Sequence, residues 1–171
     1  MADAPTEGAS RETTVTDDLL PPTPANHPDS IKKLAATLRR LDEAHRRYRV
    51  HAAKVVGMAP TDLSALLVVS ENPGITPGAL AKELVLSTGT VTAVVDRLEA
   101  SGRVARVAHP GDRRSLHLQL TEQGTQIASA LDEAYWYVLS TTGTDETIAG
   151  ALPQLDGITE ALDAVASEAV G

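Results

Sequence analysis

The feature that most constrains the fold is an ordered series of caps and turns between Thr76 and Thr121. Thr76-Pro77 predicts the start of a short helix that ends near Leu84. Ser87 predicts the cap of a second helix that runs to about Ser101, where a glycine follows. A hairpin over residues 104–120 comes next. Two helices joined by a short turn and followed directly by a two-stranded hairpin are typical of a winged helix-turn-helix.

The return strand carries the hairpin prediction. Leu116, Leu118 and Leu120 alternate there with polar residues, as expected for a strand with one buried face. The outgoing strand alternates only weakly, and Arg106 is its one polar residue. His-Pro-Gly-Asp at residues 109–112 predicts the turn between the strands.

Long apolar patterns flank this region. Ser30 predicts the start of a helix whose apolar positions follow alternating three- and four-residue steps, and a helix after Thr121 is apolar on two faces. Neither can bury its apolar surface within one small lobe, so we expect a second copy of the chain to cover it. The predicted fold is mainly α with a small β-wing (α+β), a winged helix-turn-helix with N- and C-terminal dimerisation helices. The expected parts are a disordered or loosely ordered acidic, proline-rich arm (1–29), an N-terminal dimerisation helix (30–56), the DNA-binding lobe (60–120) and C-terminal dimerisation helices (121–171).

Composition supports a helical chain. The sequence has four aromatic residues and no Phe, which disfavours sandwiches and barrels. It has no cysteine, which excludes disulfides and thiolate zinc sites. The Met1 end shows no secretory pattern, and no apolar stretch is long enough to span a membrane, so we expect a cytoplasmic protein.

The net charge of −8 is unevenly distributed. Residues 31–120 have a positive balance, whereas residues 121–171 contain nine acidic side chains and no Lys or Arg. A local basic region, rather than the global charge, is what meets phosphate. The distribution therefore permits DNA binding through the middle of the chain and disfavours it through the C-terminal part.

The helix after Ser87 offers a small, hydroxyl-rich surface opposite its apolar face. Such a surface lets a helix lie close to base edges, and threonine methyl groups can contact thymine methyl groups. An ordinary polar helix face is the alternative interpretation. The expected DNA-binding residues on this helix are Ser87, Thr88, Gly89, Thr90, Thr92, Ala93 and Arg97.

The hairpin tip is the stronger indication. Arg113 and Arg114 place two guanidinium groups where a wing reaches a narrow minor groove, whose negative potential attracts arginine. Asp112 beside them is suited to orienting one of them through a charge-assisted hydrogen bond. The alternative is a pair of solvated charges at a turn.

These residues resemble the MarR family of regulators. The resemblance rests on Val91-Thr92, Asp96-Arg97-Leu98-Glu99, Gly102 with Val104 and Arg106, and above all Asp112-x-Arg114 followed by Leu118-x-Leu120-Thr121 and Gly124.

The resemblance implies a homodimer, joined through its first, fifth and sixth helices, that binds a palindromic DNA operator. By position, Arg114 corresponds to the arginine that enters the minor groove and Asp112 to the acid that anchors it. Residues 87–93 correspond to the major-groove readers. Arg103 departs from the family pattern, which usually has an apolar residue there, and we expect its side chain to turn outward, toward phosphate.

Many relatives look like repressors released by small, often aromatic, anionic ligands. The candidate pocket residues are Arg47, Tyr48, His51, Met58 and Trp136. The alternative is that Tyr48 and Trp136 belong to the core and that the cationic side chains are solvated. The five histidines lack metal-ligand spacing, so no metal and no cofactor are expected.

Two other functional classes, an enzyme and a protein–protein adaptor, would require different sequence features. An enzyme would need a glycine-rich nucleotide or nucleophile motif, and none is present, so no catalytic residues are expected. A winged helix used only for protein–protein contact has no need for an arginine-rich tip. A DNA-binding regulator without a ligand remains an alternative.

Overall fold

The computed structural model describes residues 27–109 and 112–168, with side chains for 27–108 and 116–167. The elements are α1 (Asp29–Val55), α2 (Pro60–Glu71), α3 (Pro77–Glu83), α4 (Thr88–Ala100), β1 (Val104–His109), β2 (Asp112–Leu120), α5 (Glu122–Ser140) and α6 (Asp145–Glu168). None of the described helices is by itself long and apolar enough to cross a membrane.

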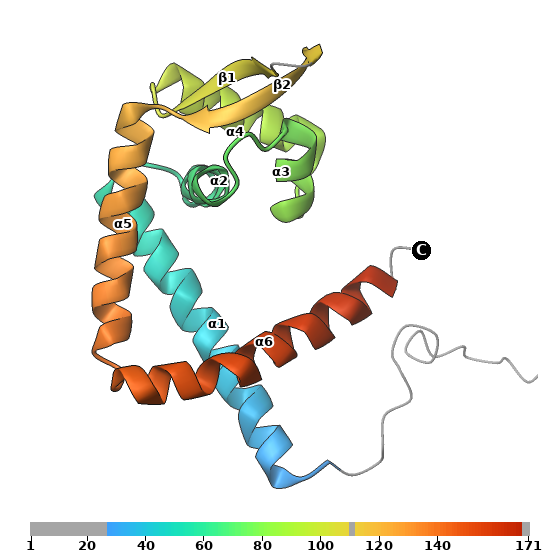
Figure 1. Ribbon diagram of the computed structural model, residues 1–171, viewed down its shortest axis with the longest axis vertical. Helices are drawn as coiled ribbons and strands as arrows, with labels where there is room; N and C mark the ends of the chain where they lie inside the picture. Colours follow the sequence, from blue (N-terminus) through green and yellow to red (C-terminus); the bar gives the residue numbers. More distant parts are fainter. Residues whose placement is uncertain (1–26, 110–111, 169–171) are drawn as a thin grey trace, which may run out of the picture. The chain divides into compact units, whose positions relative to one another are not determined.

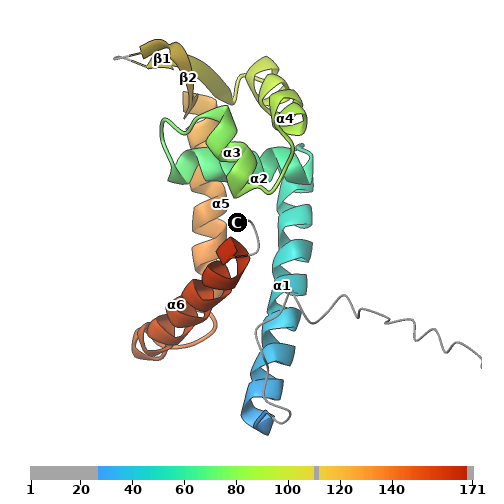
Figure 2. The ribbon, with the colours of Figure 1, turned by 90° about the vertical axis from the view of Figure 1, so that its right-hand side faces the viewer.

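The chain divides into two compact units. One runs from Ala35 to Ala149, and the other contains the described parts of 1–34 and 150–171. The first unit holds the lobe formed by α2, α3, α4 and the β1–β2 hairpin, with α5 continuing directly from β2 (Figures 1 and 2). The second holds the first turns of α1 and most of α6.

Three of the predicted caps are confirmed, whereas Ser30, expected to cap the first long helix, lies inside α1, which begins at Asp29. Thr76 Oγ1 accepts a hydrogen bond from the backbone N–H of Ala79, and Ser87 Oγ accepts one from Thr90. Thr121 Oγ1 accepts one from Gly124 at the start of α5. Each bond satisfies a backbone donor that the first helical turn leaves without a partner. The order of helices and hairpin is therefore the predicted winged helix-turn-helix.

The wing is an antiparallel pair whose register matches the alternation in the sequence. Val104 pairs with Leu120, Arg106 with Leu118 and Ala108 with Leu116, so these residues share one face. Val104 and Leu118 are buried in the lobe core. The core also takes the inward face of α4, namely Val91, Val94, Val95 and Leu98.

Candidate functional site

The exposed face of α4 presents the residues expected to bind DNA. Ser87 and Thr88, Gly89 and Thr90, and Thr92 and Ala93 are all exposed. Three of the four hydroxyls are engaged locally: Ser87 Oγ lies 2.8 Å from Thr90 Oγ1, and Thr92 Oγ1 donates to the Thr88 carbonyl at 2.9 Å. These bonds hold the side chains against the helix. The exposed face of α4 therefore consists of hydroxyl and methyl groups that project little from the helix.

Arg97 is tied to the scaffold. Its Nε and Nη2 donate to the two carboxylate oxygens of Asp62, at 3.0 and 2.5 Å. Asp62 lies in the first turn of α2 and is buried, whereas the Arg97 side chain remains 54% exposed. The hydrogen bond that Arg97 donates to Asp62 raises the pKa of the Arg97 guanidinium, so it stays charged. This bidentate pair fixes α4 to α2, and it leaves part of the guanidinium open to solvent.

Arg106 joins the wing to α4. Its guanidinium donates to Asp96 Oδ1 at 2.5 Å and also to Glu99, both on α4. Its side chain is only 21% exposed, and these hydrogen bonds, that to Asp96 first, raise the pKa of Arg106. The ion pairs set the position of β1 relative to α4.

Sequence reasoning missed both anchors. Nothing in the local pattern pairs Asp62 with Arg97, because 35 residues separate them. A signal did exist for Arg106, because it lies two residues after Val104 on the same strand face, and a charge on an apolar face needs a partner.

The expectation for Arg103 was wrong. Its guanidinium turns inward, with Nη2 3.5 Å from the Val56 carbonyl just beyond α1, and its Nε is buried without a hydrogen-bond partner among the described residues. The Arg103 carbonyl accepts a hydrogen bond from Thr121 and lies where a side chain on Gly124 would be, so this strand end is packed tightly against α5. That tight junction directs the Arg103 side chain toward α1.

The wing tip lies mostly outside the described side chains. The backbone of Asp112, Arg113 and Arg114 belongs to β2, but the orientation of these three side chains falls outside the described residues. Their assigned roles stay predictions.

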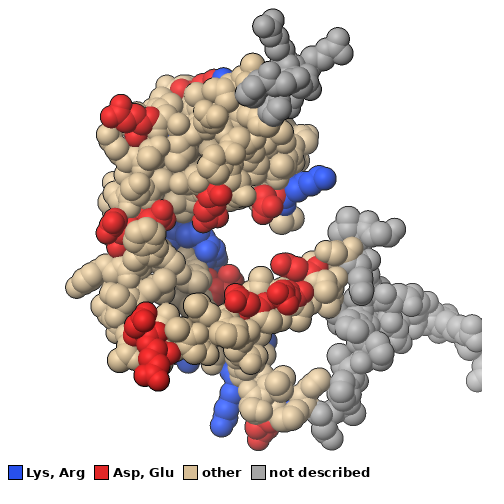
Figure 3. Space-filling view, viewed as in Figure 1, with Lys and Arg blue, Asp and Glu red and all other residues tan. Residues whose placement is uncertain are grey.

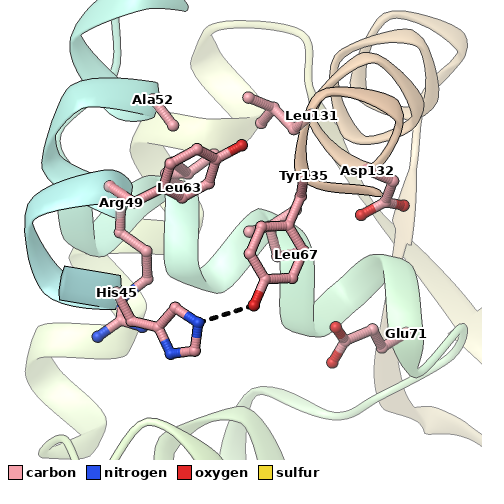
Figure 4. Close-up of a pocket in the computed structure, with 10 residues that line it drawn as sticks. His45, Arg49, Ala52, Leu63, Leu67, Glu71, Leu131, Asp132 and Tyr135 are labelled. Carbon is pink, nitrogen blue, oxygen red and sulfur yellow. Dashed lines mark hydrogen bonds between the residues drawn. The ribbon is translucent and has the colours of Figure 1, made fainter. Parts of the chain in front are cut away.

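A cavity of about 260 Å³ lies between α1, α2 and α5 (Figure 4). Its apolar walls come from Ala52, Leu63, Leu67 and Leu131, and its polar lining from His45, Tyr48, Arg49, Glu71, Asp132 and Tyr135. Of the five residues expected to form a pocket, Tyr48 lines this cavity, whereas Arg47, His51, Met58 and Trp136 do not.

The cavity has an ordered aromatic side. Tyr135 and His45 share a hydrogen bond of 2.8 Å between the phenol oxygen and Nε2, and the rings of Tyr48 and Tyr135 lie 5.5 Å apart. Met58 instead packs into the core, and Trp136 is exposed. Periodicity gives a residue's helix face but not the contents of the space beside it, so it does not indicate which residues line this cavity.

Comparisons with known proteins agree with this geometry. Residues 56–115, which include α2, α3, α4 and β1, match the family model for the MarR family. The chain is 42% identical over 90 residues to an uncharacterized HTH-type transcriptional regulator, YcgE, of Bacillus subtilis, a match that covers 52% of this chain and 58% of that protein. The lobe is a MarR-family winged helix.

The chain is also similar to the transcriptional repressor MprA of Escherichia coli. The two are 35% identical over 102 residues, which cover 54% of this chain and 58% of MprA. The chain thus spans less than two thirds of these curated relatives. Among solved structures, a MarR family protein from Bacillus stearothermophilus superposes with a TM-score of 0.71 at 23% identity, covering 81% of this chain and 99% of that one. Streptococcus pneumoniae FabT, solved in complex with DNA, superposes with a TM-score of 0.62 at 23% identity, covering 79% and 99%. At this identity the two structures show a shared fold.

Proposed function

We propose that this chain is a homodimeric, sequence-specific DNA-binding transcription regulator, and specifically a repressor. In this proposal α4 enters the major groove of a palindromic operator and the β1–β2 wing reaches the adjacent minor groove. The observation that carries it is the exposed hydroxyl face of α4, which the ion pairs of Arg97 and Arg106 hold in fixed relation to α2 and to the wing.

The geometry suggests a role for each group on α4. Thr88, Gly89, Thr92 and Ala93 are small enough for the helix to approach base edges, while Ser87 and Thr90 at its first turn are suited to a phosphate oxygen. Arg97 has two donors occupied by Asp62, which leaves the exposed part of its guanidinium for a DNA phosphate. Its first task is to hold α4 in place.

The wing supplies the second contact. Because β1 is fixed to α4 through Arg106, the described strands of the hairpin keep a set position relative to the recognition helix. Arg113 and Arg114 would then enter the minor groove together, with Asp112 orienting one of them. This arrangement accounts for two adjacent arginines in the wing of a chain whose net charge is negative.

Homodimerisation is supported by apolar side chains that the described residues leave exposed on the flanking helices. A monomer would leave these side chains in water, whereas a second copy would cover them. They are Ile31, Leu41, Val50 and Val55 on α1, Trp136, Tyr137, Val138 and Leu139 on α5, and Leu152, Leu155, Leu162 and Val165 on α6. Acidic side chains also follow α6 (Figure 3), which disfavours DNA contact there.

Release by a small aromatic effector is assigned to the cavity between α1, α2 and α5. Its polar groups carry both signs, with Arg49 on α1 opposite Glu71 and Asp132, and none of the three makes an ion pair with another described residue. Two carboxylates beside two tyrosine rings favour an aromatic ligand with a protonated amine over a simple anion. Tyramine and 4-hydroxybenzoate are a matched cationic and anionic pair of probes. Tyramine is expected to release DNA at the lower concentration, and equal or reversed potency would contradict the assignment.

The DNA-binding proposal is tested by fluorescence anisotropy with the chain's own upstream intergenic DNA at several salt concentrations. The wild-type protein is expected to bind with a Kd of roughly 10⁻⁸ M or tighter, with affinity falling steeply with salt. Arg114→Ala should lose roughly 1–3 kcal/mol of binding free energy. Arg39→Ala, an exposed arginine on α1, is the matched control and should bind as the wild type does. Equal binding of upstream and random DNA by the wild type would refute the proposal.

A further inference from the structure

Val85, between α3 and α4, has a backbone conformation that its side chain disfavours. Its φ is +52°, and among the described residues it is the one non-glycine residue with a positive φ. For a β-branched side chain the left-handed region is strained, because Cβ and its substituents crowd the neighbouring carbonyl. Strain of this kind persists where the surrounding structure imposes it and is often found at functional positions.

The strain arises from the way α3 ends. The N–H of Val85 donates to the Lys82 carbonyl and that of Leu86 to the Ala81 carbonyl, at 3.1 and 2.9 Å. This pair of bonds is a Schellman motif, which requires a left-handed residue after the helix.

Two other described helices end in the same way, and both use glycine. Gly57 follows α1 with φ +65°, and Gly102 follows α4 with φ +70°, each with the corresponding pair of hydrogen bonds. Glycine adopts this conformation without steric cost. The chain therefore has glycine at two of these three described helix ends, and valine at the end of α3, which leads into α4.

Packing within the chain does not compensate for this strain. Leu84 and Leu86 on either side pack against the lobe core, but Val85 is 90% exposed, the highest value among the exposed large hydrophobic residues that the structure describes. Any gain from the valine side chain must come from a partner outside the lobe.

The position of Val85 indicates what that partner is. It lies two residues before Ser87, the N-cap of α4, and so at the end of the helix proposed to enter the major groove. An isopropyl group cannot form a hydrogen bond, and the apolar group that base edges present in the major groove is the C5-methyl of thymine. Resting on the proposed DNA-binding function, we propose that Val85 is a specificity-determining residue that contacts a thymine methyl group in each half-site.

Thymine-to-deoxyuridine replacement tests this contact, because it removes only the methyl group. Binding of wild-type protein and of Val85→Gly is measured on the operator and on operators with each thymine replaced in turn. At one thymine per half-site, the wild type should lose about fourfold in affinity, the factor expected for one buried methyl group. Val85→Gly removes the contact in both half-sites, so it should bind the unmodified operator about as weakly as the wild type binds an operator replaced at that thymine in both half-sites, and should lose nothing further on replacement.

Two variants separate the contact from a purely structural role. Val85→Thr keeps the branched shape but replaces one methyl group by a hydroxyl, and it should lose part of the thymine dependence. Ser87→Ala should bind all the operators more weakly while keeping that dependence. Val85→Gly should also raise the melting temperature, because it relieves the strain at this turn.

The outcomes separate this inference from the proposed function. A wild-type protein that selects its operator but is indifferent to every thymine methyl group overturns the role of Val85 alone. The role of Val85 is also overturned if Val85→Gly loses as much affinity as the wild type does when that thymine is replaced by deoxyuridine. A wild-type protein that does not distinguish operator from random DNA overturns the proposed function, and the role of Val85 with it.

Discussion

Gly124→Ala tests the junction that joins the winged lobe to α5. A Cβ at Gly124 would lie 2.0 Å from the Arg103 carbonyl oxygen and 3.1 Å from its carbonyl carbon, far inside van der Waals contact. The obstacle is backbone, so no side-chain rotation can relieve it. The same carbonyl accepts the hydrogen bond from Thr121, the N-cap of α5, so any shift also disturbs that cap.

The magnitude follows from opposing terms. Overpacking a tight contact costs about 1–3 kcal/mol, and a clash with backbone belongs at the upper end of this range. Alanine offsets part of that cost, because it is favoured over glycine in a helix by up to about 1 kcal/mol. The expected net loss in the free energy of unfolding is about 2 kcal/mol, which lowers the urea midpoint by about 1 M.

The assay is urea denaturation followed by circular dichroism at one fixed protein concentration. Gly78→Ala is the matched control, because Gly78 also lies in the first turn of a helix after a threonine N-cap, and a Cβ there would meet nothing within 4 Å. It should leave stability unchanged or raise it by up to about 1 kcal/mol. If Gly124→Ala and Gly78→Ala shift the midpoint equally, the close approach of α5 to Arg103 is refuted.

Three further substitutions probe the scaffold. Leu118→Ala removes a fully buried wing side chain and should cost about 2–5 kcal/mol in unfolding free energy, while Leu116→Ala on the exposed part of the same strand should cost much less. Arg106→Ala should lower stability by about 1–2 kcal/mol, because it breaks two partly buried ion pairs, and should also weaken DNA binding; normal stability and affinity would contradict the bracing role. Arg103→Leu should raise stability by about 1 kcal/mol in thermal or urea melts, because it removes a buried nitrogen that has no hydrogen-bond partner among the described residues, and a loss of stability would show that the guanidinium is better satisfied than its contacts indicate.

Local rules predicted the elements of the lobe because each depends on residues close in sequence. Thr76, Ser87 and Thr121 cap helices through bonds to residues three positions ahead. The alternation of Leu116, Leu118 and Leu120 predicted the return strand and its faces in the same way. Such patterns determine helix starts and strand faces whatever the rest of the chain does.

Long-range pairs were not predictable. Asp62 and Arg97 lie on different helices, and only the packing of α2 against α4 brings them together. Arg103 turned inward because Gly124 lets α5 approach the strand end, which leaves the side chain the space beside α1. The cavity likewise depends on three helices, so of the residues picked by helix face only Tyr48 lines it.

The central claim, a dimer that reads DNA sequence, is tested most directly by selection from random DNA. The purified chain is mixed with a randomised duplex library, and the retained fragments are sequenced after several rounds at physiological salt. The proposal predicts one enriched motif with two-fold symmetry, whose half-sites are centred about 10 base pairs, or a multiple of that, apart. Retained fragments with no shared motif, or a motif without an inverted repeat, would contradict it.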